Sequence, residues 1–536
     1  MIEMYIQPKI HLRNGEFSRV QGDGYAGFFR GHFYFQGNLT TSANFADTFE
    51  LKDLSTTVIE SWNGEFSCIL TDNDGNTSLI SDKKRTIPLF YRRNEDSSWT
   101  IQDYNADYQY PTIEKDALND FLMTGFVSGH KTLHPDWFQT EACTIVELSA
   151  EQNVISYFSL QTEEKEQDFN ELVSELKSIF HQIFDDLKER IGDKQIIIPL
   201  SGGYDSRIIA LMLKERNLTD QILAFTYGRP NNLESSVSKQ IADRLGLQWR
   251  YYAYDKAMWE EVYASDEWKR YVDYTFNGAS VPHLQDFPSV KRLMEDTELS
   301  GAVFMPGHSL DYLAGGHLPY EAVYTNELSQ DQIVGFIQDK HFKLWQTPNS
   351  LNEDMPAISS RIKETFDNKP FFSNELGCNI VDDWNMKERQ SKFIINSVRV
   401  YEFYGQQWTL PLWDDRLIWF FKKVPVKWKY KKYLYDVTLH EMFPEYFEMP
   451  QPNEERVSPK NKYGVLYPAL KKVYRTQKLW KQYYNEPMEW FGIYPSYYKY
   501  LSNLTFKKEG IRFSNPYNIN SFIVKDTLDS LGGNSK

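Results

Sequence analysis

The chain has 536 residues, of which 41% are apolar and 25% are charged, an ordinary globular composition that is long enough for two or more domains. Its 59 lysines and arginines against 74 aspartates and glutamates give a net charge of −15, so nucleic acid, which requires a basic footprint, is not an expected partner. No apolar run approaches the roughly 20 residues of a membrane span, and the first residues lack the basic region and apolar core of a signal peptide. Cys68, Cys143 and Cys378 lie far apart, without the spacing of a metal site or a disulfide framework. These features predict a cytoplasmic protein.

Residues 1–165 are predicted to form a mainly antiparallel sheet packed against few helices. Short segments of alternating apolar and polar residues are typical of strands, and Gly, Asn and Asp between them are typical of turns. Residues 72–75 (DNDG) indicate a hairpin turn, and 144–158 indicate a further hairpin. A helix is predicted over 116–126, ending at Gly125. The predicted strands are 31–39, 65–72, 76–82 and 87–93.

A strand, a tight turn and a helix are predicted over 196–207, which has the sequence IIIPLSGGYDSR. Two glycines let the backbone bend sharply and approach a ligand closely. The turn starts a helix, where free N–H groups and the helix dipole favour an anion, and two serines add hydroxyl donors. A carboxylate would repel a bare phosphate but suits a phosphate that carries Mg²⁺. The alternative is a serine–glycine turn that only caps the helix. The residues predicted to face the ligand are Ser201, Gly202, Gly203, Asp205 and Ser206.

The segments around this turn alternate between strands and helices, which predicts a parallel sheet covered by helices. A helix over 163–191 precedes the turn, and a strand over 221–229 follows it. A helix over 232–246 and another strand come next. Ligands of such sheets bind at the carboxyl ends of the strands, so the turn and Gly228 would both face the ligand.

Three separated stretches resemble the asparagine synthetase family, in the order in which that family has them. The hexapeptide SGGYDS resembles the pyrophosphate loop of N-type ATP pyrophosphatases, which cleave ATP between the α- and β-phosphates and adenylate a carboxylate or carbonyl oxygen. Residues 301–317 (GAVFMPGHSLDYLAGGH) resemble the family's GEGSDELFGGY. Residues 408–425 resemble its R-x-PFLD-x-x-L…LP, and 429–435 (KYKKYLY) resemble its K-x-(I/L)-L-R. The matching positions are Gly307, Asp311, Leu313, Gly315, Gly316, Pro411, Leu412, Trp413, Asp414, Lys432, Tyr433 and Leu434.

The first part of the chain is similar to the class II glutamine amidotransferase half of the same family. The similar segments are 63–72 (NGEFSCILTD), 78–93 (SLISDKKRTIPLFYRR) and 121–139 (FLMTGFVSGHKTLHPDWFQ). The family's nucleophile, a cysteine at position 2 whose own amine acts as base, is absent because this chain begins Met1-Ile2-Glu3. Cys68 follows a strand pattern and is predicted to be a core thiol. We therefore expect a degenerate amidotransferase-like domain that does not hydrolyse glutamine.

Two further positions depart from the family. His308 replaces a glutamate thought to assist amide formation, which puts aspartate as the substrate in doubt. This histidine could act as a general base near neutral pH, or it could be a hydrogen-bonded residue without a catalytic task. Asp436 stands where the family has an arginine.

The resemblance implies roles for individual residues. Asp205 and Asp311 would hold Mg²⁺ against the leaving pyrophosphate, although a glycine-rich turn with a capping aspartate is the alternative for the second. Lys432 would neutralise the phosphates, with Lys429 and Lys431 as rivals and a solvated lysine run as the plain alternative. Gly228 would border the adenine. Gly307 would belong to the pyrophosphate site, and His308 would be the candidate catalytic base.

The predicted architecture is an α+β part followed by an α/β part. The predicted domains are an amidotransferase-like domain (1–165), an ATP pyrophosphatase domain with a parallel sheet (166–440) and an aromatic, basic helical extension (441–536). The predicted function is an ATP- and Mg²⁺-dependent, amide-forming ligase that joins a small-molecule or sugar carboxylate to ammonia or an amine. A homodimer is compatible with the family. The alternative is a non-catalytic, nucleotide-binding scaffold on the same fold.

Overall fold

The part of the chain before about residue 160 forms two β-sheets in this computed structural model, which describes residues 7–13, 17–104, 112–163, 167–295, 299, 301–345, 355–451, 488, 505–508, 511–514 and 519–531. The larger sheet has the order β11-β10-β6-β5-β3-β2 with β4 on β3, and the smaller has the order β1-β8-β7-β9. Within the described residues every pairing in these sheets is antiparallel except that of β1 with β8. This confirms the predicted antiparallel first part. The strands are β1 (Lys9–His11), β2 (Ser18–Gly22), β3 (Tyr25–Phe35), β4 (Asn38–Thr40), β5 (Asn63–Asp72), β6 (Thr77–Ser81), β7 (Phe90–Arg93), β8 (Trp99–Gln102), β9 (Phe138–Gln139), β10 (Thr144–Leu148) and β11 (Gln152–Ser156).

The single strand predicted over 31–39 is a hairpin in the structure. Strand β3 ends at Phe35, and β4 begins at Asn38 and pairs back onto it. Gln36 and Gly37 connect the two strands with φ of 51° and 80°. Two consecutive residues with positive φ are the signature of the tight hairpin turn that suits the natural twist of paired strands. The apolar alternation on both sides of this turn made it look like one strand.

Strand β5 divides the apolar side chains of this half between two cores, because alternate residues of a strand point to opposite faces. Ile69 packs between the two sheets with Leu79 of β6 and Tyr91 of β7. Cys68 is buried on the other face, in the large core that continues into the rest of the molecule. The prediction that Cys68 is a core thiol is therefore confirmed.

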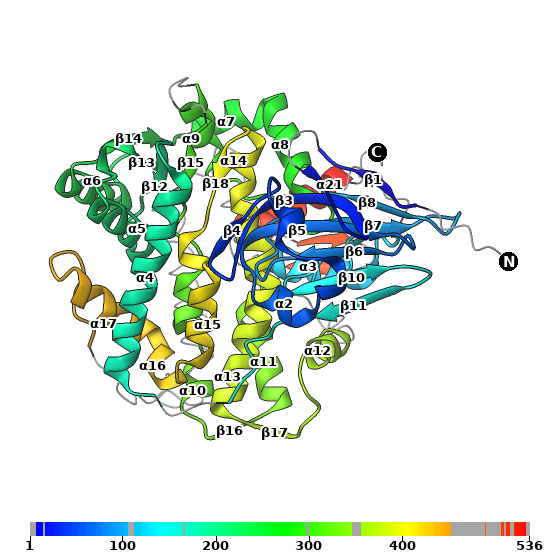
Figure 1. Cartoon of the computed structure of the whole chain (residues 1–536). Coiled ribbons are helices and arrows are strands. Elements are labelled where there is room, and N and C mark those ends of the chain that lie inside the picture. The colour runs from blue at the N-terminus through cyan, green and yellow to red at the C-terminus, as the bar shows by residue number, and fades with distance from the viewer. Residues whose placement is uncertain are drawn as a thin grey trace.

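The second half is built on a five-stranded parallel sheet with the order β14-β13-β12-β15-β18. Its central strand contains Ile196, Ile197 and Ile198, which have no exposed surface. A strand buried on both faces by helices is expected to be a continuous apolar run of this kind. The predicted parallel sheet is confirmed (Figure 1). The strands are β12 (Ile196–Pro199), β13 (Ile222–Gly228), β14 (Gln248–Ala253), β15 (Val303–Phe304) and β18 (Gln407–Trp408).

Helices surround this sheet and fill the space between it and the antiparallel sheets (Figure 1). The long helix α4 begins later than predicted, because the side chain of Asp168 accepts hydrogen bonds from the backbone N–H groups of Asn170 and Glu171 and caps it. Helix α6 has the predicted bounds, with Gly246 in the left-handed conformation after its last residue. The helices before residue 300 are α1 (Phe45–Thr48), η1 (Leu51–Asp53), α2 (Thr56–Glu60), α3 (Lys115–Thr124), α4 (Phe169–Ile191), α5 (Tyr204–Glu215), η2 (Thr219–Gln221), α6 (Leu233–Leu245), α7 (Lys256–Ala264), α8 (Asp266–Phe276) and α9 (Phe287–Met294).

The segments after β15 are mostly helical, with one small antiparallel two-stranded sheet of β16 (Glu327–Ser329) and β17 (Phe371–Ser373). Two of the helical segments, η4 and η6, have the wide π-helical hydrogen-bonding pattern, which is rare and often occurs at functional sites. The elements are η4 (Tyr312–Gly316), α10 (Tyr320–Val323), α11 (Gln330–His341), α12 (Met355–Lys363), α13 (Asn374–Asn385), η6 (Met386–Ile394), η7 (Ile395–Val398), α14 (Arg399–Phe403), η8 (Pro411–Trp413), α15 (Asp415–Lys423), α16 (Val426–Lys429), η9 (Tyr430–Lys432) and α17 (Tyr433–Met442).

The C-terminal part contributes a hairpin, β19 (Thr505–Lys508) and β20 (Ile511–Ser514), and a last helix, α21 (Ile519–Leu531). Helix α21 is tied to the body of the protein, since the Ser521 hydroxyl donates to the Leu344 carbonyl at 2.6 Å. Most of the aromatic, basic helical extension predicted over 441–536 lies outside the described residues. None of the described helices is both long enough and apolar enough to cross a membrane. The boundaries at 165 and 440 remain predictions.

Buried ion pairs join the antiparallel sheets to the parallel-sheet half. Between β6 and β7, Lys83 and Lys84 each approach Asp415, at the start of α15, at 2.9 and 3.0 Å. All three side chains have at most 2% of their surface exposed. Farther along the interface, Arg30 of β3 pairs with Glu402 of α14 at 2.8 Å. The two halves are therefore held together by charge as well as by the shared apolar core.

Candidate functional site

The candidate site lies at the middle of the parallel sheet, where strands that follow β12 are added on one side of it and later strands on the other. From β12 the chain proceeds to β13 and β14 on one side, and later to β15 and β18 on the other. The loops that follow β12 and β15 therefore lie next to each other at the carboxyl ends of these two adjacent strands, the usual ligand position of an open parallel sheet. The SGGYDS loop (201–206) follows β12, and Gly307 follows β15. The structure thus brings together the two motifs that the sequence analysis singled out.

An internal hydrogen-bond network shapes the SGGYDS loop. The Ser201 hydroxyl accepts from the Gly203 N–H at 3.1 Å, and the Ser206 hydroxyl accepts from the Ser201 N–H at 3.1 Å. Helix α5 starts directly after Gly203, which supplies no side-chain cap. The serines therefore hold the loop rather than cap the helix, and the helix N-terminus is left for an anion.

The two glycines of the loop are not required by the backbone conformation. Neither has a positive φ, and Gly203 is extended with φ −74° and ψ 170°. A Cβ at Gly202 would meet Val237 at an ordinary 3.5 Å. The expectation that these two glycines are needed for a sharp bend of the backbone is therefore not supported. The remaining reason for the glycines is the close approach of a ligand to the loop backbone.

Gly307, in contrast, is required by the protein itself. A Cβ at this position would lie 2.7 Å from the backbone nitrogen of Ser206 and 3.0 Å from the carbonyl carbon of Asp205. Real Cβ atoms do not come so close to backbone atoms, so the loop after β15 rests directly on the SGGYDS loop. This contact places Gly307 in the site and fixes the distance between the two loops.

We expect Gly307→Ala to displace the SGGYDS loop and weaken nucleotide binding by about tenfold or more, with a loss of about 1–3 kcal/mol of stability from overpacking. Gly335→Ala is the matched control, because a Cβ at Gly335, in α11, would meet nothing within 4 Å. Titration of both variants with ATP and Mg²⁺ checks this expectation. Equal nucleotide affinity in the two variants would contradict it.

Asp205 and Asp311 face a common space. The Tyr435 hydroxyl donates to the Asp205 carboxylate at 2.9 Å. Burial and the charge of Asp311 raise the pKa of Asp205 to about 7, although the Tyr435 hydrogen bond and Lys432 oppose the shift. The raised pKa of Asp205 beside a second negative charge indicates a place that a bound cation would stabilise. Asp311 is 49% exposed and lies 3.6 Å from the His317 ring.

The structure distinguishes the three rival lysines. Lys429 is buried and pairs with Asp382 at 2.7 Å, so it belongs to the interior. Lys431 is exposed and lies over the Tyr430 ring. The Lys432 ammonium lies 5.6 Å from the ring centre of Tyr204, inside the SGGYDS loop, and acts electrostatically on Asp205. Lys432 alone of these three is directed to the loop.

Lys432 occupies a strained piece of backbone. It and Lys431 have φ of 62° and 54°, in the left-handed region that costs an ordinary residue about 1–3 kcal/mol. Asp436, one helical turn later, lies 3.9 Å from the Lys432 ammonium. Burial raises the pKa of Asp436 to about 6, and Lys432 opposes the shift. Asp436, the departure from the family pattern, is therefore a neighbour of the site.

His308 is half-buried and hydrogen-bonded. The Ser397 hydroxyl donates to the Ile394 carbonyl at 2.7 Å, so the His308 Nε2–H donates to that hydroxyl at 2.8 Å. Burial and the nearby His283 lower the pKa of His308 to about 3, which makes it a weak base. This geometry favours a hydrogen-bonded histidine without a catalytic task over a general base.

We expect His308→Gln, which can keep a hydrogen bond to Ser397, to change the rate of any amide-forming reaction by less than about threefold. A general base contributes about 10²–10⁴-fold, so a loss of that size would assign the catalytic role to His308. The measurement is product formation at saturating ATP. His308→Ala, which removes the hydrogen bond, should lower thermal stability more than His308→Gln.

Gly228 ends β13, next to β12, with φ 119°. Its carbonyl accepts from the Tyr254 N–H at 2.9 Å and from the Tyr251 hydroxyl at 2.6 Å. It is therefore held at the same edge of the sheet as the SGGYDS loop. The predicted contact of Gly228 with adenine remains a prediction.

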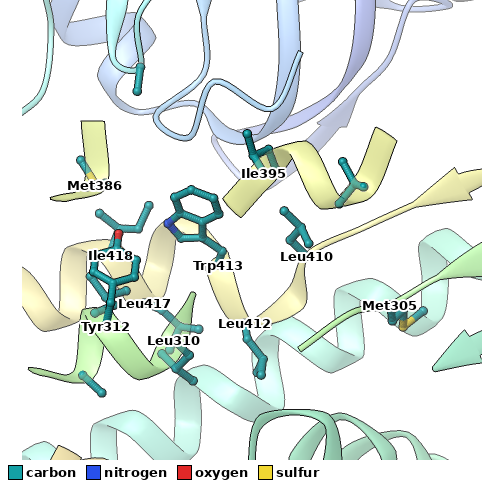
Figure 2. Close-up of a cluster of buried hydrophobic side chains, with 14 of the residues drawn as sticks. Met305, Leu310, Tyr312, Met386, Ile395, Leu410, Leu412, Trp413, Leu417 and Ile418 are labelled. Carbon is teal, nitrogen blue, oxygen red and sulfur yellow. The ribbon is translucent and has the colours of Figure 1, made fainter. Parts of the chain in front are cut away.

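An apolar cluster holds the segments that carry the site (Figure 2). Leu310 and Tyr312 flank Asp311, and Leu412 and Trp413 precede Asp414. Figure 2 shows these side chains gathered with residues of α15. The cluster is buried, so the Asp311 segment is positioned by core packing. Its members include Met305, Leu310, Tyr312, Met386, Ile395, Leu410, Leu412, Trp413, Leu417 and Ile418.

Sequence reasoning missed three polar residues near the site. Tyr435, which binds Asp205, lies 230 residues away from it in sequence. Asn385 donates to the His317 ring at 3.0 Å, and the other side of that ring faces Asp311. No local pattern signals such contacts. The one available signal is position, since His317 and Tyr435 are each the last residue of a stretch that resembles the family.

The donor set fits a magnesium ion bound together with phosphates. Mg²⁺ prefers oxygen ligands, and it usually takes only one or two carboxylates and completes its shell with water and phosphate oxygens. Asp205 and Asp311 supply two such carboxylates. Among the described residues no group of three potential metal ligands is preassembled.

Comparison with known proteins leaves the site to be judged on its own geometry. No family model matches the chain, and no curated protein matches it. One solved structure with some similarity is "NH3-dependent NAD synthetase from Campylobacter jejuni subsp. jejuni NCTC 11168 in complex with the nitrate ion". It is 12% identical, the alignment covers 42% of this chain and 98% of that chain, and the TM-score is 0.22. A TM-score this low supports no inference about the fold or the function of this chain.

Proposed function

We propose that this chain is an ATP-dependent ligase that activates a carboxylate as its adenylate and then forms an amide. The observation that carries the proposal is the direct contact of Gly307 with the SGGYDS loop, which joins two anion- and metal-suited loops at the switch point of the sheet. Lys432 and the pair Asp205 and Asp311 complete a site in which both signs of charge converge. A triphosphate with its metal ion has the complementary charges.

In the proposed reaction an oxygen of the substrate carboxylate attacks the α-phosphorus, and the bond from that phosphorus to the bridging oxygen breaks. Pyrophosphate leaves, and an amine nitrogen then attacks the acyl carbon, displaces AMP and loses a proton. The SGGYDS backbone and the hydroxyls of Ser201 and Ser206 would hold the pyrophosphate, and Lys432 would balance its charge. Bound Mg²⁺, held by Asp205 and Asp311, would offset charge on the leaving group.

The nitrogen source is proposed to be ammonia or an amine from outside the first half. Burial raises the pKa of the Cys68, Cys143 and Cys378 thiols, so none of them is a ready nucleophile. The predicted absence of a position-2 nucleophile concerns residues outside the described part of the chain. A glutaminase assay of the purified protein tests this part of the proposal.

ATP–pyrophosphate exchange with the purified protein and Mg²⁺, across a panel of carboxylic acids that includes aspartate and uronic acids, tests the central step. Exchange with one acid would establish adenylation and identify the substrate. Nucleotide binding without exchange across the panel would favour the alternative, a nucleotide-binding scaffold. If ATP does not bind, the proposal is wrong.

Lys432→Ala should lower this exchange by about 10²–10³-fold, the usual effect of removing one group that stabilises developing charge. Lys431→Ala is a closely matched control, because both lysines have left-handed backbone conformations and both variants remove one positive charge. Lys431→Ala should change exchange by less than about twofold. Similar losses in both variants would show that backbone strain, and not the Lys432 ammonium, is responsible.

A further inference from the structure

Each of the two carboxylates proposed to hold the metal ion has one oxygen turned to a donor of the protein itself. The Tyr435 hydroxyl donates to Oδ1 of Asp205 at 2.9 Å. Nε2 of His317 lies 3.6 Å from Oδ2 of Asp311, slightly farther than the length of a hydrogen bond, about 2.7–3.2 Å. The second oxygen of each carboxylate is the one that a metal ion would take.

The two carboxylates belong to loops that touch. A Cβ at Gly307 would lie 3.1 Å from Cβ of Asp205, and Gly307 is four residues before Asp311. On the other side of Asp311, a Cβ at Gly316 would lie 3.4 Å from Cδ of Lys432. The loop that carries Asp311 therefore contacts both the SGGYDS loop and the lysine that is directed to it.

A sharp turn at Gly315 brings His317 back to Asp311. Residues six apart in a regular α-helix do not share a face. Gly315 interrupts η4 with φ 92°, in the left-handed region, and a Cβ there would collide with the Lys429 carbonyl. Conformation and space both require glycine at this position. The histidine ring reaches the carboxylate because the helix is broken between them.

A relay of buried side chains determines which ring nitrogen of His317 carries the proton. The Ser309 hydroxyl donates to Oε1 of Gln390 at 3.0 Å. The Gln390 amide in turn donates to Oδ1 of Asn385 at 3.4 Å, so the Asn385 nitrogen is the atom that faces the ring. That nitrogen donates to Nδ1 of His317 at 3.0 Å. Because Nδ1 accepts, the ring proton is on Nε2, the atom that faces Asp311.

We propose that Tyr435 and His317 restrict both carboxylates to binding through one oxygen, and thereby select Mg²⁺ over Ca²⁺ as the ion bound with the nucleotide. This inference rests on the proposed function, since it takes Asp205 and Asp311 as the carboxylates of the metal site. Mg²⁺ demands a near-octahedral shell, whereas Ca²⁺ accepts roughly six to eight oxygens and often binds a carboxylate through both. A protein donor on one oxygen blocks that second mode and does not hinder Mg²⁺.

The test measures, by calorimetry on the full chain, the affinities for the Mg²⁺ and Ca²⁺ complexes of α,β-methylene-ATP. The wild-type protein should bind the Mg²⁺ complex at least about tenfold more tightly. Tyr435→Phe, which removes only the hydroxyl, and His317→Phe, which removes both ring nitrogens, should each reduce this preference by about threefold or more. His317→Gln, whose amide can accept from Asn385 and donate to Asp311, should keep the preference within about twofold of the wild-type value.

Tyr157→Phe is the matched control, because it also removes a buried hydroxyl, one that donates to the Ser81 carbonyl at 2.6 Å in the first half. It should lower the melting temperature without changing the ratio of the two affinities. Equal affinity of the wild-type protein for both complexes would overturn the inference, and so would an unchanged ratio in Tyr435→Phe and His317→Phe. Either result would leave the proposed function standing, because the nucleotide still binds. Failure of the wild-type protein to bind either complex would overturn both.

Discussion

Replacing Asp205 with asparagine is expected to abolish ATP–pyrophosphate exchange and, at the same time, to stabilise the nucleotide-free protein. The activity loss should be about 10²–10³-fold or more, because the variant lacks one of two carboxylates that would hold the metal ion. The gain in stability has a separate cause. Burial and the Asp311 charge make the ionised form of Asp205 unfavourable in the folded protein.

The sign of the effect follows from the pKa. The pKa of Asp205 is raised from 3.8 to about 7 on folding, so the folded protein holds this proton more tightly than the unfolded chain does. Stability from this group is therefore fully present below about pH 4 and is lost as the pH rises from about 4 to about 7. Each unit corresponds to about 1.4 kcal/mol. Because the side chain is only half-buried, we expect a gain of about 1–3 kcal/mol for Asp205→Asn at about pH 8.

Urea unfolding of both proteins without nucleotide, at about pH 5.5 and about pH 8, measures this effect. The difference between variant and wild type should be larger at the higher pH. Asp193→Asn, in the exposed turn before β12, is the control and should behave as wild type at both values. A destabilised Asp205→Asn at about pH 8 would show that the carboxylate has a structural role that the site geometry does not reveal.

The sequence predicted the strand, turn and helix around the SGGYDS loop because the signals for these elements are local. A run of three buried isoleucines, a serine–glycine turn and an amphipathic helix are adjacent in the chain, so propensity and periodicity are sufficient to place them. The carboxyl ends of parallel strands must meet at one edge of the sheet, and Gly307, which follows another strand, therefore lies at the same edge as the SGGYDS loop. No contact had to be known for either inference.

The sequence could not predict the contacts that define the geometry. Gly307 is a glycine because the backbone near Ser206, about 100 residues earlier, occupies the place of its Cβ. Lys432 rather than Lys431 faces the loop because two consecutive residues adopt left-handed conformations, which break the helical periodicity that a pattern argument assumes.

Asp415→Ala should be the most destabilising single change outside the candidate site, with a loss of about 3–5 kcal/mol of unfolding free energy. The side chain accepts from Lys83 at 2.9 Å and lies 3.0 Å from the Lys84 ammonium, and all three groups are buried. Burial alone would lower the pKa of Lys84, but Asp415 and the nearby Asp82 and Glu65 outweigh it and raise that pKa. Without Asp415, two buried ammonium groups lose a shared counter-charge.

Two further variants test whether the lost charge balance, rather than any substitution at this interface, causes the destabilisation. Asp96→Ala breaks an ion pair of similar length, Lys9 to Asp96 at 2.8 Å, whose partners are 52% and 51% exposed, and it should have little measurable effect. A triple variant with Lys83→Met, Lys84→Met and Asp415→Leu removes the buried charges together and should recover most of the stability lost in Asp415→Ala. The measurement is urea unfolding followed by tryptophan fluorescence. If the triple variant is no more stable than Asp415→Ala, then hydrogen bonds rather than charge balance hold the two halves together. One such hydrogen bond joins Lys83 to the Trp62 carbonyl at 2.9 Å.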